Sequence, residues 1–138
     1  MDYLELTAPC GLDCWNCPLF LAREDRNLRQ VIARKTGRPE EACLCLGCRA
    51  EGGAIAFVGM DGPCRVWRCT QERNHLLCSE CDDFPCDNLH PRADMAGERP
   101  HNLKVFNLCQ IRRMGLARWA QEKAPQRREA YFKGKLEL

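Results

Sequence analysis

Apolar residues recur at helical spacing in two stretches of the chain. The first begins at Pro18, which suits the first turn of a helix, and ends at Gly37, which suits a helix stop. The second begins at Asn102, a residue type that caps helices, and ends before Pro125, with Gly115 weakening its middle. The pattern predicts helices over 18–36 and 102–122, with these apolar positions: Leu21, Leu28, Val31 and Ile32, then Val105, Leu108, Cys109, Ile111, Leu116 and Trp119.

The remaining segments are less regular. Glycines surround a short apolar run within residues 51–62, which favours a short strand or a buried turn. Residues 70–77 suit one or two helical turns, and residues 89–100, with two prolines and a glycine, suit a linker or exposed loop. No apolar run approaches the roughly 18 residues of a membrane span. The acidic N-terminus lacks the order of a secretory signal, so we expect a cytoplasmic protein without a membrane partner.

Composition limits how this chain can fold. Hydrophobic residues make 45% of its 138 residues, but that total includes 12 cysteines, and Leu, Ile, Val and Phe together number only 28. Burial alone is marginal at this level, so we expect cross-links through cysteine. We predict a small, mainly α-helical single domain over residues 1–138 with long irregular, metal-stapled segments. Its expected parts are a cysteine region at about 7–89, a linker at about 90–101, a C-terminal helix at about 102–122 and a basic tail at 123–138.

The cysteines favour metal ligation, because a reducing cytoplasm disfavours disulfides. Three Cys-x2-Cys pairs occur, and two residues between thiolates let both sulfurs reach one ion, so that two pairs complete a tetrahedral site. We interpret Cys43 and Cys109 as small buried hydrophobes. The other ten cysteines are the candidate metal ligands: Cys10, Cys14, Cys17, Cys45, Cys48, Cys64, Cys69, Cys78, Cys81 and Cys86.

Several ways of sharing these ligands remain open. The four-cysteine groupings are Cys45, Cys48, Cys64 and Cys69; or Cys69, Cys78, Cys81 and Cys86; or Cys14, Cys17, Cys45 and Cys48. The first two compete for Cys69. Ten ligands supply two four-thiolate sites with two cysteines left over, or three sites that share ligands or recruit a histidine. His75 and His90 lie near the last group, although a surface role is favoured for each.

Spacing does not separate zinc from iron. The order Cys10-x3-Cys14-x2-Cys17-Pro18 resembles iron–sulfur ligation. Radical enzymes that use S-adenosylmethionine share this spacing, but they need a barrel that 138 residues cannot build. A thioredoxin-like reading of Cys14 and Cys17 is disfavoured, because no strand–helix–strand pattern precedes them and Cys10 crowds the site. We therefore expect zinc, in two or more ions, with an iron–sulfur cluster as the alternative.

Charge and motifs say little about partners or catalysis. Residues 1–98 hold 11 Lys and Arg against 16 Asp and Glu, whereas residues 99–138 hold 10 against 3. Such a basic stretch is most often a solvated helix face, or it pairs with the chain's own acidic part. RNA binding through the C-terminal helix is the disfavoured alternative.

No Gly-x-Ser-x-Gly or phosphate-binding glycine loop occurs, and Asp82, Asp83 and Asp87 are expected to face solvent, so no catalytic residue is assigned.

Five blocks of the sequence, in order, resemble a cysteine-rich bacterial and archaeal family, domain of unknown function 3795. The resemblance spans about residues 7–122. The similar blocks are Cys10–Pro18, Cys45–Cys48, Cys64–Cys69, Cys78–Cys86, and a closing helix with Asn102–Lys104, Ile111–Leu116 and Trp119. It implies metal binding, with zinc as the usual assignment and no established activity. The ten candidate ligands fall on the family's pattern, and Cys43 and Cys109 do not. The rubredoxin-like cysteine pair that some members carry after the last helix is absent here, since no cysteine follows Cys109.

The sequence thus leads to two hypotheses. The first is a protein without catalytic residues whose zinc–thiolate sites staple the fold and present an interaction surface, with another protein as the expected partner. The alternative is an iron–sulfur protein that transfers electrons or senses redox state.

Overall fold

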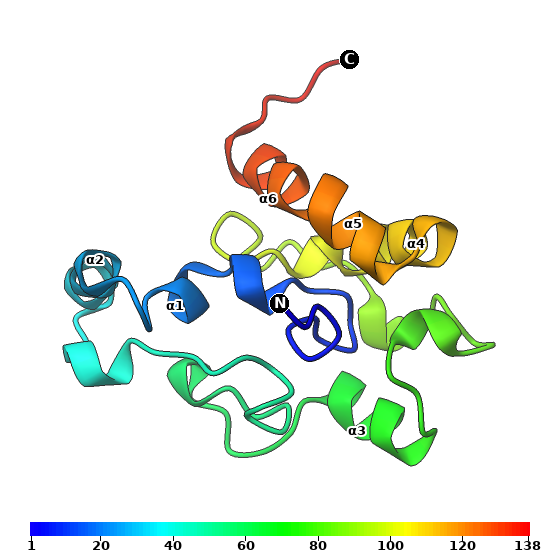
Figure 1. The fold of residues 1–138 in the computed structure, drawn as a ribbon, viewed down its shortest axis with the longest axis horizontal. Helices are drawn as coiled ribbons and strands as arrows, with labels where there is room; N and C mark the ends of the chain where they lie inside the picture. The colour runs from blue at the N-terminus through cyan, green and yellow to red at the C-terminus, as the bar shows by residue number, and fades with distance from the viewer.

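The computed structural model describes all residues 1–138 (Figure 1). Half of the residues are helical and there are no strands, which confirms a small, mainly α-helical single domain. The α-helices are α1 (Pro18–Leu21), α2 (Arg26–Thr36), α3 (Arg65–Glu72), α4 (Lys104–Met114), α5 (Leu116–Glu122) and α6 (Ala124–Lys133). Short 3-10 turns are η1 (Cys14–Asn16), η2 (Glu40–Ala42), η3 (Ala56–Val58), η4 (Cys78–Glu80), η5 (Asp87–Leu89) and η6 (His101–Leu103).

The helices surround the irregular cysteine-bearing segments. Figure 1 shows α4, α5 and α6 in a row along one side of the molecule, α3 on the opposite side, and α1 and α2 at one end. The loops that carry the cysteines lie in the middle, between the row of helices and α3. A long apolar helix of the kind that spans a membrane is absent from this arrangement.

The first predicted helix is broken in two. α1 ends at Leu21 and α2 starts at Arg26, because the Asp25 carboxylate accepts the backbone N–H of Leu28 at 3.0 Å and so caps a new helix. Arg29 of α2 donates to the carbonyl of Ala22 at 3.0 Å, which satisfies one of the free groups at the end of α1. The predicted stop at Gly37 is confirmed, since Gly37 is the left-handed C-cap of α2.

The second predicted helix is also broken, at its weak point. Gly115, at φ 84° and ψ 151°, separates α4 from α5, a conformation that glycine adopts without steric cost. Within the expected basic tail, for which no helix was predicted, residues 124–133 form α6. Pro125 lies in the first turn of α6, where its missing N–H costs nothing. The proline therefore follows the end of α5 and also lies at the start of α6.

Two shorter predictions also need correction. Residues 51–62 form no strand; they turn through η3, but the turn is not the buried one predicted, since only Gly53 among these residues is buried. The helical turns expected at 70–77 belong to α3, which begins earlier, at Arg65, because the Cys64 Sγ accepts the backbone N–H of Trp67 at 3.4 Å. α3 ends at Glu72, so residues 73–77 lie outside it.

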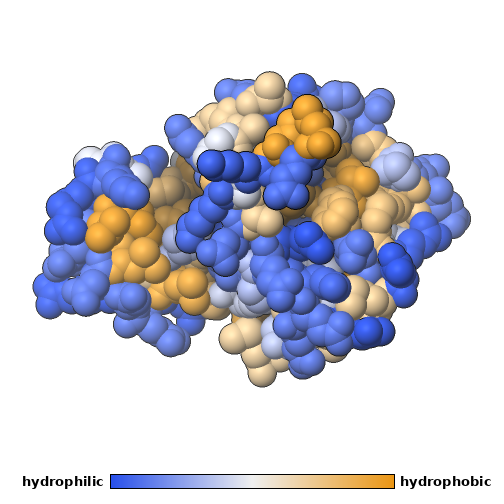
Figure 2. All heavy atoms as spheres, turned by 90° about the horizontal axis from the view of Figure 1, so that it is seen from above, coloured by the Kyte–Doolittle hydropathy of each residue, from blue (hydrophilic) through white to orange (hydrophobic).

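The hydrophobic core is small and lies under α4, α5 and α6. Trp119, with no exposed surface, stands among its eight buried residues: Val66, Leu77, Leu89, Leu108, Ile111, Trp119, Ala120 and Ala124. Cys10, Cys64 and Cys78 pack against this core, which therefore supports the cysteine segments. No residue of α1 or α2 belongs to it, and α2 has no buried residue. Figure 2 accordingly shows a largely hydrophilic surface with separate apolar areas, one of them at the end of the molecule where α1 and α2 lie.

Candidate metal centre

The ten candidate cysteines form one continuous series of neighbouring thiols. We divide it by location into an inner cysteine group, an outer cysteine group and the Cys17–Cys45 pair. The inner cysteine group is Cys10, Cys14, Cys48 and Cys64; the outer cysteine group is Cys69, Cys78, Cys81 and Cys86. Cys14 lies within electrostatic range of Cys17, which links the pair to the inner cysteine group. Cys78 lies within range of Cys10, which links the inner and outer cysteine groups.

The inner cysteine group draws its members from three segments. Cys48 lies within electrostatic range of Cys10, Cys14 and Cys64. The backbone N–H of Cys48 donates to the Cys14 Sγ at 3.4 Å, so the first and second Cys-x2-Cys motifs meet here. Cys64 joins them at the start of α3, where its backbone N–H donates to the carbonyl of Gly53 at 3.1 Å. Contacts between neighbouring backbones, rather than helices, therefore position this group.

Arg49 connects the segments that carry these cysteines. Its Nε donates to the carbonyls of Leu4 and Thr7, at 2.8 and 3.0 Å, and its Nη2 donates to the carbonyl of Leu76 at 2.6 Å. The backbone N–H of Cys78 adds a direct bond to the carbonyl of Pro9 at 2.9 Å. The N-terminal loop, the Cys45–Cys48 turn and the start of the outer cysteine group are thus tied together.

The Cys17–Cys45 pair lies at one end of the series. Cys45 is buried, and its Sγ accepts the backbone N–H of Gly47 at 3.4 Å. The carboxylate of Glu51 accepts the N–H groups of Leu46 and Ala56, at 2.6 and 2.8 Å, and so fixes the Cys45–Cys48 turn against η3. The Cys-x2-Cys spacing is therefore held by its own local hydrogen bonds.

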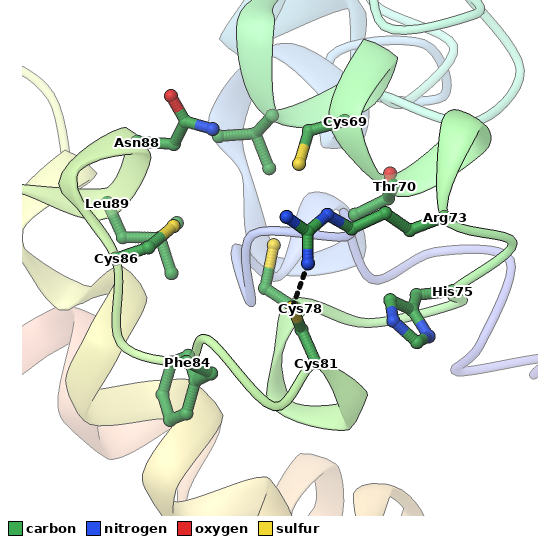
Figure 3. A pocket seen from close by; sticks show the side chains of 11 residues that line it. Cys69, Thr70, Arg73, His75, Cys78, Cys81, Phe84, Cys86, Asn88 and Leu89 are labelled. Carbon is green, nitrogen blue, oxygen red and sulfur yellow. Dashed lines mark hydrogen bonds between the residues drawn. The ribbon is translucent and has the colours of Figure 1, made fainter.

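The outer cysteine group lines one pocket, shown in Figure 3. Cys69 comes from α3, Cys78 and Cys81 from η4 and the residue after it, and Cys86 from the loop before η5. The Glu80 carboxylate accepts the N–H of Leu76 at 2.8 Å and so holds the η4 turn. The pocket is partly open to solvent, and seven further residues, several of them apolar, complete its lining. Four cysteines from three segments therefore face one pocket.

Arg73 borders this pocket on its solvent side. Its Nη1 donates to the Cys81 Sγ at 3.3 Å and to the Asp83 carboxylate at 2.6 Å. In Figure 3 the guanidinium lies between Cys69 above and Cys78 and Cys81 below. A second, more open recess adjoins the pocket; it shares Arg73 and three of the four cysteines and adds Asp83 and Asp87. The outer cysteine group therefore meets solvent at a charged opening.

Burial keeps several of these thiols protonated. It raises the pKa of Cys14 to about 11 and that of Cys45 to about 12. It raises the pKa of Cys78 to about 12, with the charges of neighbouring cysteines adding to the rise. Burial also raises the pKa of Cys10 and of Cys48. A cation is needed to hold such groups as thiolates near neutral pH.

A buried carboxyl group lies beside the first cysteines. Asp13 is 2% exposed, and it accepts hydrogen bonds from Asn16 at 2.9 Å and from Arg128 of α6 at 3.3 Å. Burial raises the pKa of Asp13, while the Asn16 hydrogen bond and the Arg128 charge oppose that rise. Asn107 of α4 adds a buried hydrogen bond to the carbonyl of Gly11 at 2.9 Å. The C-terminal helices are thereby fastened onto the Cys10–Cys14 loop.

The groupings expected from the sequence fare differently. Cys69, Cys78, Cys81 and Cys86 are brought together. Cys64 and Cys69 are not, because Cys69 lines the outer pocket while Cys64 neighbours Cys10 and Cys48. Cys14, Cys17, Cys45 and Cys48 are neighbours, but Cys14 and Cys48 also adjoin Cys10 and Cys64. No three His, Cys, Asp or Glu side chains converge closely enough to hold a metal ion in this structure.

Of the two cysteines interpreted as buried non-ligands, one is buried and the other is exposed. The buried role of Cys43 is confirmed: it has no exposed surface, and its thiol donates to the carbonyl of Pro39 at 3.4 Å. The same interpretation is wrong for Cys109, which is exposed on α4, because its position falls on the outer face of that helix. His75 lines the outer pocket and is half-buried, and His90 is exposed.

Sequence reasoning missed the polar residues that position the cysteines. Arg49, Arg73 and Asp13 lie in or beside cysteine motifs, but nothing in their spacing marks them. The contacts of Arg49 with Leu76 and of Asp13 with Arg128 join residues 27 and 115 positions apart, whereas Arg73 contacts Cys81 and Asp83, 8 and 10 positions away. The one sequence feature that could have pointed to them is a charged residue inside or next to a cysteine motif.

No curated protein and no solved structure matches the chain. One family model matches residues 6–91, more than half of the 138 residues. The resemblance expected over residues 7–122 is therefore confirmed for the cysteine region, and the C-terminal helices lie beyond the matched residues. The chain belongs to the family described as Protein of unknown function (DUF3795).

Proposed function

We propose that this protein binds metal through its cysteines, as two or more zinc ions, and that these ions staple the irregular segments. The observation that carries the proposal is the outer cysteine group, whose four thiols line one small pocket. The inner cysteine group supplies a second set of four. Tetrahedral coordination by four thiolates is the usual form of a structural zinc site.

The small core supports a structural role for the metal. Eight buried residues form the core, and the segments that carry the cysteines have no strands and only short helices. Bound metal would offset part of the thiolate charge and cross-link these segments, so that its binding free energy contributes to folding. An iron–sulfur cluster is the alternative. Soft thiolate ligands suit both metals, so the metal content distinguishes the two.

We expect the stapled domain to serve as an interaction surface for another protein. The RNA alternative loses support from the ion pairs within the C-terminal helices. Arg118, Arg128 and Lys133 pair with acidic side chains of this chain, namely Glu122, Asp13 and Glu129. Only Asp13 lies outside the basic stretch, so the Arg128–Asp13 pair is the one of these three that offsets its excess of positive charge.

The test is a metal and acid-labile sulfide assay with a visible spectrum, on protein purified without oxygen or added metal. We expect two or more equivalents of zinc, no sulfide and no colour. Chelation should then remove the helical circular dichroism, because the apo chain lacks its cross-links. Iron with sulfide would establish the alternative, and protein that stays folded without any metal would refute the proposal.

Cysteine variants locate the ions. Cys81→Ser and Cys48→Ser should each lower the metal content by about one equivalent, because each removes a ligand from a different four-cysteine group. Cys109→Ser is the matched control, since Cys109 is an exposed cysteine outside the series. An equal loss of metal in the control would argue against the assignment of these groups.

A further inference from the structure

We propose that Arg73 covers the outer cysteine group and controls how fast its metal exchanges with solvent. The inference rests on the proposed metal-binding function and assigns Arg73 as a positioning residue of that site. It makes the outer cysteine group an exchangeable site whose lability is set by one ion pair, Arg73 with Asp83.

The contacts of Arg73 place it at the opening of the pocket. Arg73 lines both the pocket and the more open recess beside it, as do three of the four cysteines. Its Nη1 bonds the Cys81 Sγ at 3.3 Å and the Asp83 carboxylate at 2.6 Å. Arg73 is the one Arg or Lys among the residues that line the pocket, which also include His75 (Figure 3). The guanidinium therefore lies where the pocket meets the recess, in contact with one of the four cysteines.

Charge explains why Arg73 should slow metal release. Four thiolates around a divalent ion carry a net charge of −2, and a guanidinium beside one sulfur offsets part of it. Hydrogen bonds from a charged donor to a thiolate are stronger than neutral ones. Asp83 holds the guanidinium toward the pocket, and Asp83 and Asp87 give the recess a negative charge that attracts an incoming cation.

The experiment follows release of Co²⁺, whose thiolate complexes absorb visible light, from the full chain reloaded with that metal alone. Excess EDTA is added and the charge-transfer absorbance is recorded with time. The signal that Cys86→Ser lacks is assigned to the outer cysteine group. We expect Arg73→Ala to release this Co²⁺ about tenfold faster, the effect of losing one charge-assisted hydrogen bond, and to leave the remaining signal unchanged.

Two further variants separate the effect of the positive charge of Arg73 from the effect of its guanidinium lying over the pocket. Arg73→Lys keeps the positive charge without the planar fork, and Asp83→Asn frees the guanidinium from its anchor, so each should give an intermediate rate. Arg118→Ala is the matched control, because the Arg118–Glu122 pair on α5 has similar exposure and no cysteine contact.

The outcomes distinguish the two proposals. A chain that takes up no Co²⁺ contradicts metal binding and the role of Arg73 with it. Co²⁺ that binds in the outer cysteine group but leaves Arg73→Ala no faster than wild type, or no faster than Arg118→Ala, overturns the role of Arg73 and leaves metal binding standing.

Discussion

At the scale of single residues, Arg49 is the side chain on which the arrangement of cysteine segments most depends. It donates to the carbonyls of Leu4, Thr7 and Leu76, in two segments remote from its own. Arg49→Ala would leave these carbonyls without their donor, and we expect a loss of about 2 kcal/mol in the free energy of unfolding. Urea denaturation of the metal-loaded protein measures it. Arg34→Ala, on the exposed end of α2, is the control, and an equal effect there would refute this role for Arg49.

Gly53 shows how closely α3 approaches the second cysteine motif. It has φ 77°, and a Cβ at this position would lie 2.3 Å from the Trp67 Cγ. We expect Gly53→Ala to destabilise the protein by about 3 kcal/mol, combining overpacking with left-handed strain. Gly59→Ala separates the two causes, because Gly59 has φ 75° with open space around it, and it should cost about 1 kcal/mol. Equal losses in thermal unfolding would show that the Trp67 contact is unimportant.

At the scale of elements, local chemistry predicted where helices stop better than where they break. Gly37 as a stop and Gly115 as a weak point follow from the backbone freedom of glycine. The break before α2 was missed, because Asp25 caps a helix only when the chain has already turned. α6 was missed because Pro125 fits a helix start as well as a helix end, and only a tertiary contact decides between them.

That contact joins α6 to the first cysteine loop through Arg128 and Asp13. Asp13 is 2% exposed, so Arg128→Ala would leave a buried carboxylate without its ion-pair partner and should cost about 3 kcal/mol. Thermal unfolding at neutral pH measures the loss. Asp13→Asn in the same variant should recover part of it, since it removes the buried charge. Lys133→Ala, which breaks an exposed pair on α6, should cost little, and a comparable cost would contradict a special role for Arg128.

At the scale of the whole molecule, the sequence identified the ten cysteines but not the way they assemble. Spacing predicts pairs such as Cys78 and Cys81, because two residues suffice for a tight turn. It also suggested that Cys69 joins them. It could not place Cys10 near Cys64 and Cys48, since these neighbours are brought together by hydrogen bonds between separate segments, such as those from Cys64 to Gly53 and from Arg49 to Thr7.

The pH dependence of stability tests whether the folded molecule carries metal. Unfolded thiols hold their protons below a pKa of about 8.5, whereas metal-bound thiolates hold none. The unfolded state then binds more protons, so the stability of the metal-loaded protein should rise with pH from 6 to 8.5. For a folded chain without metal, stability should instead decrease as the pH rises. Burial raises the pKa of Cys14 to about 11 and of Cys78 to about 12, so its folded state keeps protons that the unfolded state loses.

Stability of a metal-free fold should therefore be flat below pH 8.5 and fall as the pH rises from 9 toward 12. Urea midpoints across pH 6–10 distinguish the two curves. Zinc competition with a chelator adds an independent reading, since ligand thiols must release protons and the apparent affinity should increase with pH. A flat urea midpoint below pH 8.5, together with affinity that does not change with pH, would show that the thiols are not ligands and that packing alone sustains the fold.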